Sequence, residues 1–562
     1  MENVRTIMTP QKVSKEYEAG LSFNQGIDLY DCVQTNENFF IGKQWEGVKS
    51  NGLPTPVFNF LKRVVLFSVA NVSTDNLKLH AKRMPSSGQM PAYMAELLAD
   101  ILNDQFASIF EFNKMGSCIR EFCRNAAVDA DGCTYSYWDT DVDTGQPSKG
   151  AIRTEVLLNT QVLFGNPNSR DVQSQPYILI ERRMLVKDAK RRAKANGADA
   201  YLITADEKES GDPHLDNLGG DKVTVLLRLW RDEETGTIHG YECTRSAEIR
   251  KPWDLGIKLY PITWMNWDYV QDCYHGQAMI TGLIPNQIFV NKLFAMSMIS
   301  LMTLAYPKVI FDKTKVSKWS NRVGAAIAVN GNVDNVAKIM DPASISPQIS
   351  QFIDIAIGYT QKFLGASDVA LGDTRPDNTS AIIALQRAAA TPMELTKQNL
   401  LQSIEDLGRI YMEFMAGYYG NRFVEVPGLN GQGKAIVPFD FSILKEIPFT
   451  VELDVGASSY WSEIASMQTL DNLLMQGKIS TVEYLKRIPA GQITDRETLI
   501  AVLEEQERME KAMAGIPVPD GGAQQTSAPG ATDEAAPPVS GGPGYGALQR
   551  KINQTGEVPK AV

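Results

Sequence analysis

Residues 364–414 read LGASDVALGDTRPDNTSAIIALQRAAATPMELTKQNLLQSIEDLGRIYMEF, a polar stretch followed by a long helical pattern. Gly365, Gly372 and Pro376 favour turns, and few side chains of 364–380 pack, so this part is predicted to be a loop. After Pro392, apolar residues recur at spacings of three, four and seven, which predicts one apolar stripe on a helix. The stripe consists of Met393, Leu400, Ile404, Leu407, Tyr411, Phe414 and Tyr418.

We therefore expect a long helix over 381–418 that bends at Pro392 and carries a polar loop before it. The stripe suits the core of its own subunit, which we favour, or part of a subunit interface. A polar loop on a one-sided helix suits a moving part on a rigid support better than it suits an active site.

The composition is that of a chain that folds into ordinary globular cores, with 43% hydrophobic and 22% charged residues among 562. The formal net charge of −11 argues against tight DNA binding, because neutralisation of phosphates by Lys and Arg drives such binding. DNA could still pass nearby. Six cysteines lack the spacing of a redox motif or a zinc site, and we expect reduced core residues.

The N-terminus shows no basic segment followed by an apolar one, so no signal peptide is predicted. The most apolar run, 293–306, is shorter than the roughly 20 residues that a membrane span needs, and we expect a buried helix there. These features favour an intracellular or particle-associated protein without a membrane partner.

The remaining pattern mixes helices and strands, and we expect a helix-rich α+β fold. Helices are predicted at 10–34, 57–72, 92–112, 114–127, 185–195, 276–306, 347–363, 461–475 and 494–514, and another is predicted to begin after a capping box formed by Ser480 and Glu483. Strands are predicted at 77–82, 134–138, 152–157, 176–182, 308–311, 325–329, 422–426 and 447–454, with a compact β-rich module at 223–269. Residues 516–562 are rich in Pro, Gly, Ala, Ser and Thr, which predicts a disordered tail.

One short helix concentrates basic residues, namely Lys187, Lys190, Arg191, Arg192 and Lys194. We favour the interpretation that these cations complement the C-terminal end of the helix. The alternative is a contact with phosphate or with an acidic partner.

Two motifs fail on inspection. Gly428–Lys434 has the glycine and lysine spacing of a phosphate-binding loop, but Ala435 replaces the required hydroxyl and Pro438 stops a following helix. Asp139, Asp141 and Asp143 begin like a calcium loop, but Thr144 and Gly150 stand where Gly and Glu are needed. A hairpin is expected at each place.

No set of residues points to catalysis, a metal or a cofactor. His80, His214, His239 and His275 are far apart, and no nucleophile motif accompanies them. We expect a protein that is not an enzyme.

Several segments, in this order and spacing, resemble the portal proteins of tailed bacteriophages, the ring at one capsid vertex through which DNA is packaged and ejected. They are FFIGKQW (39–45), PVFN (56–59), HGQAMITGLIPNQIFVNK (275–292), LGASDVALG (364–372), NTSAIIALQ (378–386), VELDVGAS (451–458) and LLMQGKIS (473–480). The resemblance covers residues 11–514.

The resemblance implies a division of the chain into the parts of a portal subunit. The wing would be 1–222, the β-rich clip 223–270, and the stem helix 271–306. The alternative is that the short basic helix before the clip belongs to the stem as its first helix. A second part of the wing, 307–457, would include the channel-lining tunnel loop 364–380 and the kinked helix 381–418. A helical crown, 458–515, and the tail would follow. Residues 206–221 are loop-rich, which departs from the family pattern and leaves the first stem helix unassigned.

The resemblance also implies the partners of the chain. We expect a homo-oligomeric ring, a dodecamer, that passes double-stranded DNA and contacts the terminase, a tail adaptor, the major capsid protein and scaffolding protein. Its place would be the virion, after assembly in the host cytoplasm. In the tunnel loop the candidate DNA-facing residues are Asp368, Asp373, Arg375, Asp377 and Asn378, whose acidic balance would let DNA slide.

Two rival classes stay open at this stage. A different capsid or head-completion protein would lack the order of clip, stem and loop. A nucleotide-dependent DNA-packaging enzyme, which has less support, would require the Gly428–Lys434 run to bind phosphate.

Overall fold

The computed structural model describes most of the chain up to residue 506. It covers residues 8–50, 52–73, 77–83, 92–206, 221–305, 309–363, 391–427, 434–445, 449–455 and 460–488, with gaps at 317, 319, 321, 323–325, 335 and 340–347, and isolated positions from 496 to 506. The chain divides into two units, Met1–Ile479 and Ser480–Val562. The predicted disordered tail, 516–562, lies outside the described residues.

Two helices form where one was predicted at 10–34. Helix α1 (Pro10–Gly26) starts with Pro10 in its first turn, and the Thr9 hydroxyl accepts a hydrogen bond from the Lys12 N–H at 3.3 Å. Asp28 adopts a positive φ of 54°, which interrupts the helix. Helix α2 (Leu29–Ile41) then runs to Gly42, whose φ of 97° ends it.

The main core lies around a three-stranded sheet of order β3-β2-β9, formed by β2 (Asp131–Asp139), β3 (Ala151–Leu157) and β9 (Ile262–Asn266). Helices α3 (Phe60–Val72), α4 (Ala92–Phe112) and α5 (Met115–Asp129) contribute buried residues to the same core. A separate antiparallel pair joins β1 (Leu77–Arg83) to β14 (Phe449–Val455).

A five-stranded antiparallel sheet has the order β4-β5-β6-β7-β8. Its strands are β4 (Val162–Phe164), β5 (Ile178–Leu185), β6 (Lys222–Arg231), β7 (Ile238–Cys243) and β8 (Glu248–Asp254). Alternate side chains point to opposite faces. Leu226 therefore packs with α1, whereas Val223 and Val225 pack with the basic helix α6 (Val186–Ala195) on the other face.

The strands within 223–270 do not form a module of their own. β6 pairs with β5 along its length, from Ile178↔Leu229 to Leu185↔Lys222, and β9 pairs with β2. Sequence patterning located strands here but could not show that they complete sheets begun by residues 131–185. The predicted β content is present, and the predicted separation is wrong.

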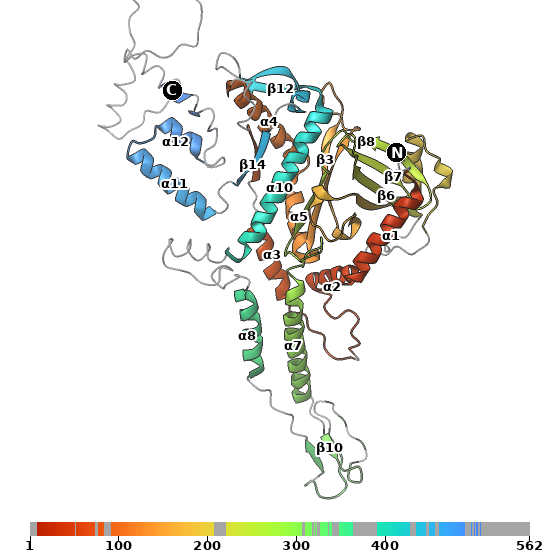
Figure 1. Cartoon of the computed structure of the whole chain (residues 1–562). Helices are drawn as coiled ribbons and strands as arrows, with labels where there is room; N and C mark the ends of the chain where they lie inside the picture. The colour runs from red at the N-terminus through yellow and green to blue at the C-terminus, as the bar shows by residue number, and fades with distance from the viewer. Residues whose placement is uncertain are drawn as a thin grey trace, which may run out of the picture. The chain divides into compact units, whose positions relative to one another are not determined.

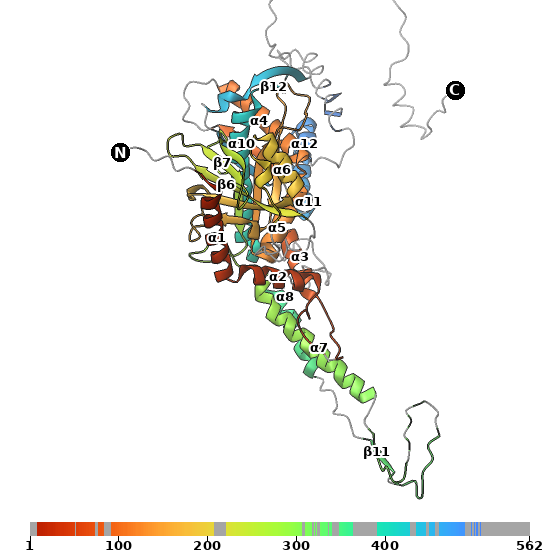
Figure 2. The ribbon, with the colours of Figure 1, turned by 90° about the vertical axis from the view of Figure 1, so that its right-hand side faces the viewer.

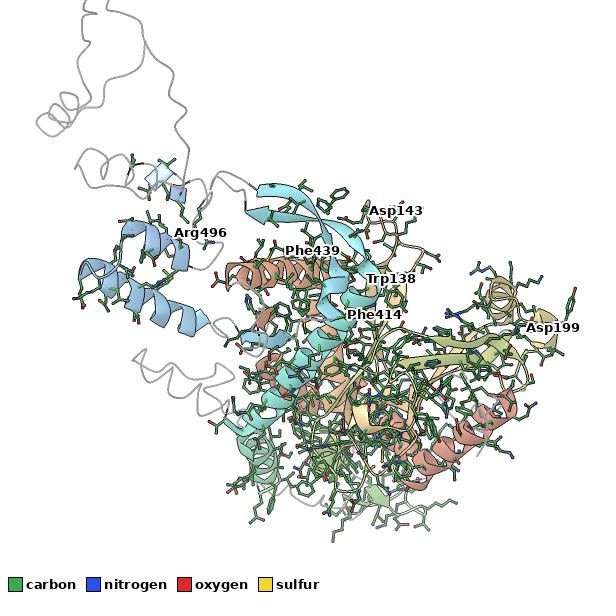
Figure 3. The ribbon with its side chains drawn as sticks, turned by 45° about the horizontal axis from the view of Figure 1, so that its top comes forward. Trp138, Asp143, Asp199, Phe414, Phe439 and Arg496 are labelled. Atoms are coloured by element: carbon green, nitrogen blue, oxygen red, sulfur yellow. The ribbon has the colours of Figure 1, made fainter. Side chains whose placement is uncertain are left out.

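Helix α10 (Glu394–Phe414) crosses the main core and continues into a π-helical turn, Met415–Tyr419 (Figure 1). The predicted stripe is buried from Met393 to Phe414, with Leu400 and Tyr411 fully inaccessible. Figure 3 shows Trp138 beside the C-terminal part of this helix, where its ring stacks on Tyr418 with 5.3 Å between centroids. The structure confirms the interpretation of the stripe as the core of its own subunit.

Helices α7 (Ile284–Ala305) and α8 (Gln348–Phe363) lie side by side and lead away from the sheets (Figure 1, Figure 2). At their far end β10 (Val309–Phe311) pairs with β11 (Ala337–Ile339). The second strand was predicted at 325–329. That prediction is wrong, because the partner of Val309 is Ile339 and the described residues 326–329 are not in a strand. We call α7, α8 and the β10–β11 hairpin the stalk.

The remaining elements complete the description. β12 (Asn421–Pro427) and β13 (Lys434–Asp440) form a hairpin, and helix α11 is Tyr460–Met475. In the second unit, helix α12 (Thr481–Arg487) begins after Ser480, whose hydroxyl accepts from the Glu483 N–H at 3.2 Å, as the predicted cap requires. Short 3-10 turns occupy Asn159–Gln161, Val172–Ser174, Ala200–Leu202, Thr281–Leu283, Thr391–Met393 and Phe441–Lys445.

Candidate functional site

The stalk leaves many large apolar side chains exposed. From Leu293 onward, helix α7 carries apolar side chains over most of its circumference, a composition that suits a helix covered on several sides. In the single chain, however, about half of the surface of several side chains remains accessible. These are Phe289 (47%), Met296 (58%), Leu301 (53%) and Met302 (53%) on α7, and Phe352 (53%), Ile355 (50%) and Tyr359 (57%) on α8.

This exposure corrects the expectation of a buried helix at 293–306. Contiguous exposed apolar surface of this extent marks an interaction site in soluble proteins. Among the described residues, none of the helices has the length and apolarity that crossing a bilayer would require.

The root of the stalk is held by a chain of buried amide side chains. Gln287 donates to the Phe58 carbonyl at 2.7 Å and to Asn291 Oδ1 at 3.0 Å, and Asn291 donates to Gln44 Oε1 at 2.6 Å. Gln44 in turn donates to the Phe39 carbonyl at 3.1 Å. Because all three amides are less than a tenth exposed, each hydrogen bond must be satisfied within this chain of groups.

Aromatic and capping contacts complete the root. The rings of Phe58 and Phe294 stack with 3.9 Å between centroids. Asn59 caps α3 and also donates to the Phe40 carbonyl at 3.0 Å, while the Trp45 indole donates to the Pro56 carbonyl at 2.9 Å. The segments 39–45, 56–59 and 284–292, far apart in sequence, therefore meet at one place. Sequence patterns gave no sign of this meeting, because hydrogen-bonded amides have no periodicity.

The hairpin end of the stalk is rich in cations. Among its described residues, Lys313, Lys315, Lys318, Arg322 and Lys338 accompany only two carboxylates, Asp312 and Asp334. Val316 is fully buried and Val336 nearly so, which gives the hairpin a small core of its own. The hairpin thus presents positive charge on a chain whose total charge is −11.

The predicted tunnel loop lies outside the described residues, and so do its candidate side chains Asp368, Asp373, Arg375, Asp377 and Asn378. Pro392 is described. It lies in the 3-10 turn Thr391–Met393 directly before α10, so α10 starts after this proline. The bend predicted between 381–390 and α10 stays a prediction.

The five basic residues of α6 have two different environments. The Arg192 guanidinium lies 3.2 Å from the carboxylate of Glu242, which is 3% exposed beneath the helix. Burial raises the pKa of Glu242, and Arg192, Arg182 and Arg250 oppose that rise. Arg192 is therefore a structural anchor, whereas Lys187, Lys190, Arg191 and Lys194 lie on the outer side.

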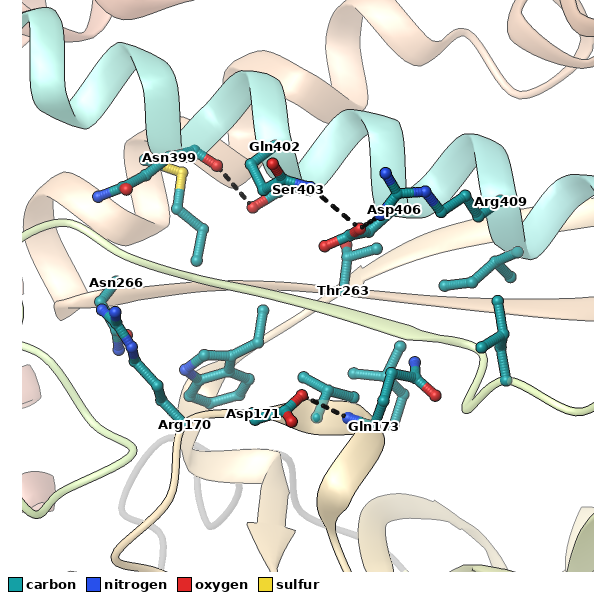
Figure 4. Close-up of a pocket in the computed structure, with 16 residues that line it drawn as sticks. Arg170, Asp171, Gln173, Thr263, Asn266, Asn399, Gln402, Ser403, Asp406 and Arg409 are labelled. Carbon is teal, nitrogen blue, oxygen red and sulfur yellow. Dashed lines mark hydrogen bonds and ion pairs between the residues drawn. The ribbon is translucent and has the colours of Figure 1, made fainter. Parts of the chain in front are cut away.

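A cleft of about 430 Å³ separates the polar side of α10 from β9 and the Val172–Ser174 turn. Figure 4 shows Asp406 and Arg409 on one side and Arg170, Asp171 and Gln173 on the other. Burial raises the pKa of Asp406, while its contact with Arg409, at 2.6 Å, opposes the rise. The charges of the cleft are largely paired, and we see no nucleophile with an adjacent base among its lining residues.

A second polar cluster is fully buried beside the start of the stalk segment. Asp131 accepts from His275 Nδ1 at 2.7 Å, from the Gly276 N–H at 2.8 Å and from Asn266 at 2.7 Å. His275 also contacts Asn24 of α1 at 3.2 Å. The cluster ties α1, β2 and the loop before α7 together, and its function is structural. His275 was visible in the sequence only as an isolated histidine.

Both failed motifs form hairpins, as predicted. Lys434 is the first residue of β13 and pairs with Pro427, so a strand stands where a phosphate-binding loop needs a helix N-terminus. The Asp139 and Asp143 carboxylates accept from the N–H groups of Asp141 and Gly145, two residues further on. Among the described residues, His, Cys, Asp and Glu side chains nowhere gather in a set of three that could hold a metal ion.

The cysteines fit the expectation in part. Cys123, Cys133 and Cys243 are buried, and Cys118 and Cys273 are partly covered, but Cys32 is exposed on α2. Burial raises the pKa of the Cys123 thiol to about 12, which keeps it protonated and unreactive.

Taken together, these observations define a mixed α+β fold with a stalk that exposes large apolar side chains. A family model described as phage P22-like portal protein matches residues 178–446, just under half of the chain. The matched segment contains the whole stalk and α10. A comparison with curated proteins gives no match. Over residues 178–446 the chain is thus similar to the portal proteins of tailed bacteriophages.

Proposed function

We propose that the chain is the portal subunit of a phage head, and that copies of it form a ring at one capsid vertex. The ring, a dodecamer, provides the channel for packaging and ejection of double-stranded DNA. The family match supports the portal function. The exposed apolar stalk is the observation that supports ring formation. Other copies of the same chain are always present, so they are the partners that can cover its apolar side chains.

Burial of the stalk side chains gives the driving force for assembly. Full burial of an exposed large apolar side chain contributes roughly 1.5–3 kcal/mol, and a side chain that is already half buried gains roughly half of that. Seven such side chains on α7 and α8 are each about half exposed, so neighbouring stalks can supply a substantial part of the association energy. A closed ring of stalks also leaves no apolar side uncovered.

The stalk further suggests which residues form the stem and the clip. Helices α7 and α8 together supply the two stem helices, including the one that the sequence left unassigned. The β10–β11 hairpin at their far end then takes the role of clip, because strands 223–270 are built into the sheets of the body. The wing is the body around the two sheets. The residues after 457 supply the crown, as proposed from the sequence.

The partners follow from this arrangement. The cationic hairpin is the docking surface for the terminase and later for the tail adaptor, while the body contacts the major capsid and scaffolding proteins. The acidic tunnel loop, 364–380, lines the channel and lets DNA slide, and Arg375 is its one cation. Assembly takes place in the host cytoplasm, and the product belongs to the virion.

The proposed ring is tested by substitutions that introduce charged side chains on the stalk. Met296→Glu together with Met302→Glu places two carboxylates in each proposed interface. Met475→Glu on α11 is the matched control, since Met475 is 85% exposed and distant in sequence. Electron microscopy and native mass spectrometry of the purified chain should show rings for the wild type and the control, and smaller species for the double variant. Rings that persist in the double variant would overturn the stalk interface.

The clip assignment separates a portal from another capsid or head-completion protein. Replacement of residues 312–336 by a short Gly-Ser linker should leave the ring intact and abolish terminase binding. If the ring of this variant still binds terminase, another segment of the chain forms the clip. The strand that begins at Lys434 does not support the alternative hypothesis of a nucleotide-dependent packaging enzyme. We therefore expect no ATP hydrolysis by the wild type or by the Lys434→Ala variant.

A further inference from the structure

The outer side of α6 gathers four cations. At about 100° of rotation per residue, Lys187, Lys190, Arg191 and Lys194 fall within roughly a third of the helix circumference. Ala189 and Ala193 lie on the opposite side and are fully buried against Val223, Val225 and Ile249 of the sheet. The cations therefore form one stripe that faces away from the protein.

The stripe is held on a fixed support. Arg192, at the side of the stripe, pairs with the buried Glu242 at 3.2 Å. The end of the helix is closed by Asn196, whose side chain donates to the Arg192 carbonyl at 2.9 Å. At its start, the Val186 N–H donates to the Asp221 carbonyl at 3.0 Å. A partner would meet this surface without having to order the helix first.

The charges of the stripe are poorly balanced within the described chain. Arg191 pairs with Asp188 at 3.2 Å, three residues earlier on the same helix. For Lys187, Lys190 and Lys194, the described residues supply no ion-pair partner. A chain with a net charge of −11 thus concentrates positive charge at one surface site.

Exposed apolar side chains border the stripe at both ends. Leu185, which precedes α6, is 47% exposed. After the helix, Tyr201 and Leu202 in the Ala200–Leu202 turn are 89% and 59% exposed. Figure 3 shows Asp199, just before this turn, far from α10 at the edge of the body. We call these seven residues, namely Lys187, Lys190, Arg191, Lys194, Leu185, Tyr201 and Leu202, the α6 patch.

We propose that the α6 patch is a docking site for an acidic segment of another protein, one that carries apolar side chains next to its carboxylates. The cations attract and orient the carboxylates, and Leu185, Tyr201 and Leu202 receive the apolar side chains. Nucleic acid fits less well, because phosphates give the two leucines nothing to bind and the acidic chain repels a long polyanion. The inference does not depend on ring formation, since α6 and the stalk are separate elements.

The test measures binding of defined probes to the full-length chain. The first probe is a short fluorescein-labelled peptide of glutamates with a central Leu-Phe pair. Its binding to the chain is measured by fluorescence anisotropy at low salt. A duplex oligonucleotide with the same label is the second probe. Three variants are compared with the wild type: Lys187→Glu with Lys190→Glu and Lys194→Glu, then Tyr201→Ser with Leu202→Ser, and a control with Lys49→Glu, Lys149→Glu and Lys258→Glu. The control makes the same change of charge at exposed lysines elsewhere.

We expect the wild type and the control to bind the peptide with similar affinity. The α6 charge variant should bind at least about tenfold more weakly, and the Tyr201/Leu202 variant several-fold more weakly. Higher salt should weaken the wild type more than the α6 charge variant. Thermal unfolding should be the same for all of them, because every changed side chain is at least partly exposed.

Three results would overturn the proposal. Equal binding by the α6 charge variant and the control would make the stripe a solvated surface. Tighter binding of the duplex than of the peptide, unaffected by Tyr201→Ser and Leu202→Ser, would assign the patch to nucleic acid. Peptide binding that appears only after Glu207, Glu209, Asp212 and Asp216 are changed to serine would mean that the chain's own acidic stretch occupies the patch.

Discussion

Helices α7 and α10 are both long and rich in apolar residues, but they differ in how far the rest of the chain buries those residues. In α10 the apolar residues form one stripe, and that stripe is buried in the core of the same subunit. In α7, from Leu293 onward, they spread over most of the circumference, and about half of the surface of several of them stays exposed. A one-sided pattern can be satisfied by one body. The exposed side chains of α7 are the ones that neighbouring copies would cover in the proposed ring.

The largest effect is expected where α10 is most deeply buried. Leu400→Ala removes a side chain that is fully inaccessible and leaves a cavity in the main core. The free energy of unfolding should fall by about 2–5 kcal/mol. Urea unfolding of the assembly-deficient Met296→Glu, Met302→Glu chain, with and without Leu400→Ala, measures the change without a contribution from oligomers. A loss below about 1 kcal/mol would mean that α10 is not part of a packed core.

A smaller effect is expected at the root of the stalk. Asn291→Ala leaves Gln44 Oε1 without its buried donor and should cost about 1–3 kcal/mol. Asn286→Ala is the control, since the Asn286 side chain bonds to Thr360 at 3.1 Å on the less buried side of the same helix. The control should cost less than Asn291→Ala. If the two variants unfold alike, the amide chain does not hold the root.

The pH dependence of stability should be visible at Asp129, the buried last residue of α5. Burial, followed by the charge of Glu37, raises the pKa of Asp129 to about 8. Between about pH 4 and pH 8 the folded state therefore holds a proton that the unfolded state has released. Stability should fall as the pH rises through this window, by up to about 1.4 kcal/mol per pH unit.

The control for this effect is Asp129→Asn, which carries no proton to lose. Thermal unfolding between pH 5 and pH 8 should be flatter for this variant than for the wild type. Parallel curves for the two proteins would show that Asp129 stays ionised in the folded state. Arg124, which lies 3.5 Å from Asp129, would be the cause of such a result.

The smallest effect on the single chain is expected on α7. Leu301→Ala changes a side chain that is 53% exposed, so the free energy of unfolding of the monomer should change by no more than about 0.5 kcal/mol. In the ring the same variant should weaken assembly, which dilution followed by mass photometry would measure. A monomer that is destabilised as much as by Leu400→Ala would remove the contrast between the two helices.

Local patterns predicted the elements that are decided locally. The stripe of α10, the cap at Ser480 and strands β1, β2 and β3 follow from periodicity and from side chains that bond to nearby backbone. The break at Asp28 was missed, because a positive φ at an aspartate has no reliable sequence signal. The second hairpin strand was placed at 325–329 instead of 337–339, since a strand of three residues carries almost no periodic pattern.

The candidate site was harder to predict, because its parts come from distant segments. Gln44, Gln287 and Asn291 are ordinary polar residues until the fold brings them together at the stalk root. The resemblance found the segments that contain them but not their contact. The exposure of α7 was also invisible, since an apolar run looks the same whether its cover comes from its own chain or from another.

The pairing of β1 with β14 has a consequence for how the chain folds as it is made. Lys82 and Glu452, whose side chains form an ion pair across these two strands, are 370 residues apart. At 5–20 residues per second, synthesis leaves β1 without its partner for on the order of 20 to 70 s. An unpaired strand edge invites aggregation during that delay, and charged side chains are the usual protection. The strand reads LKLHAKR, with Lys78 and Lys82 on its outer face. Lys78 and Lys82 thus protect β1 of the nascent chain from aggregation until β14 leaves the ribosome.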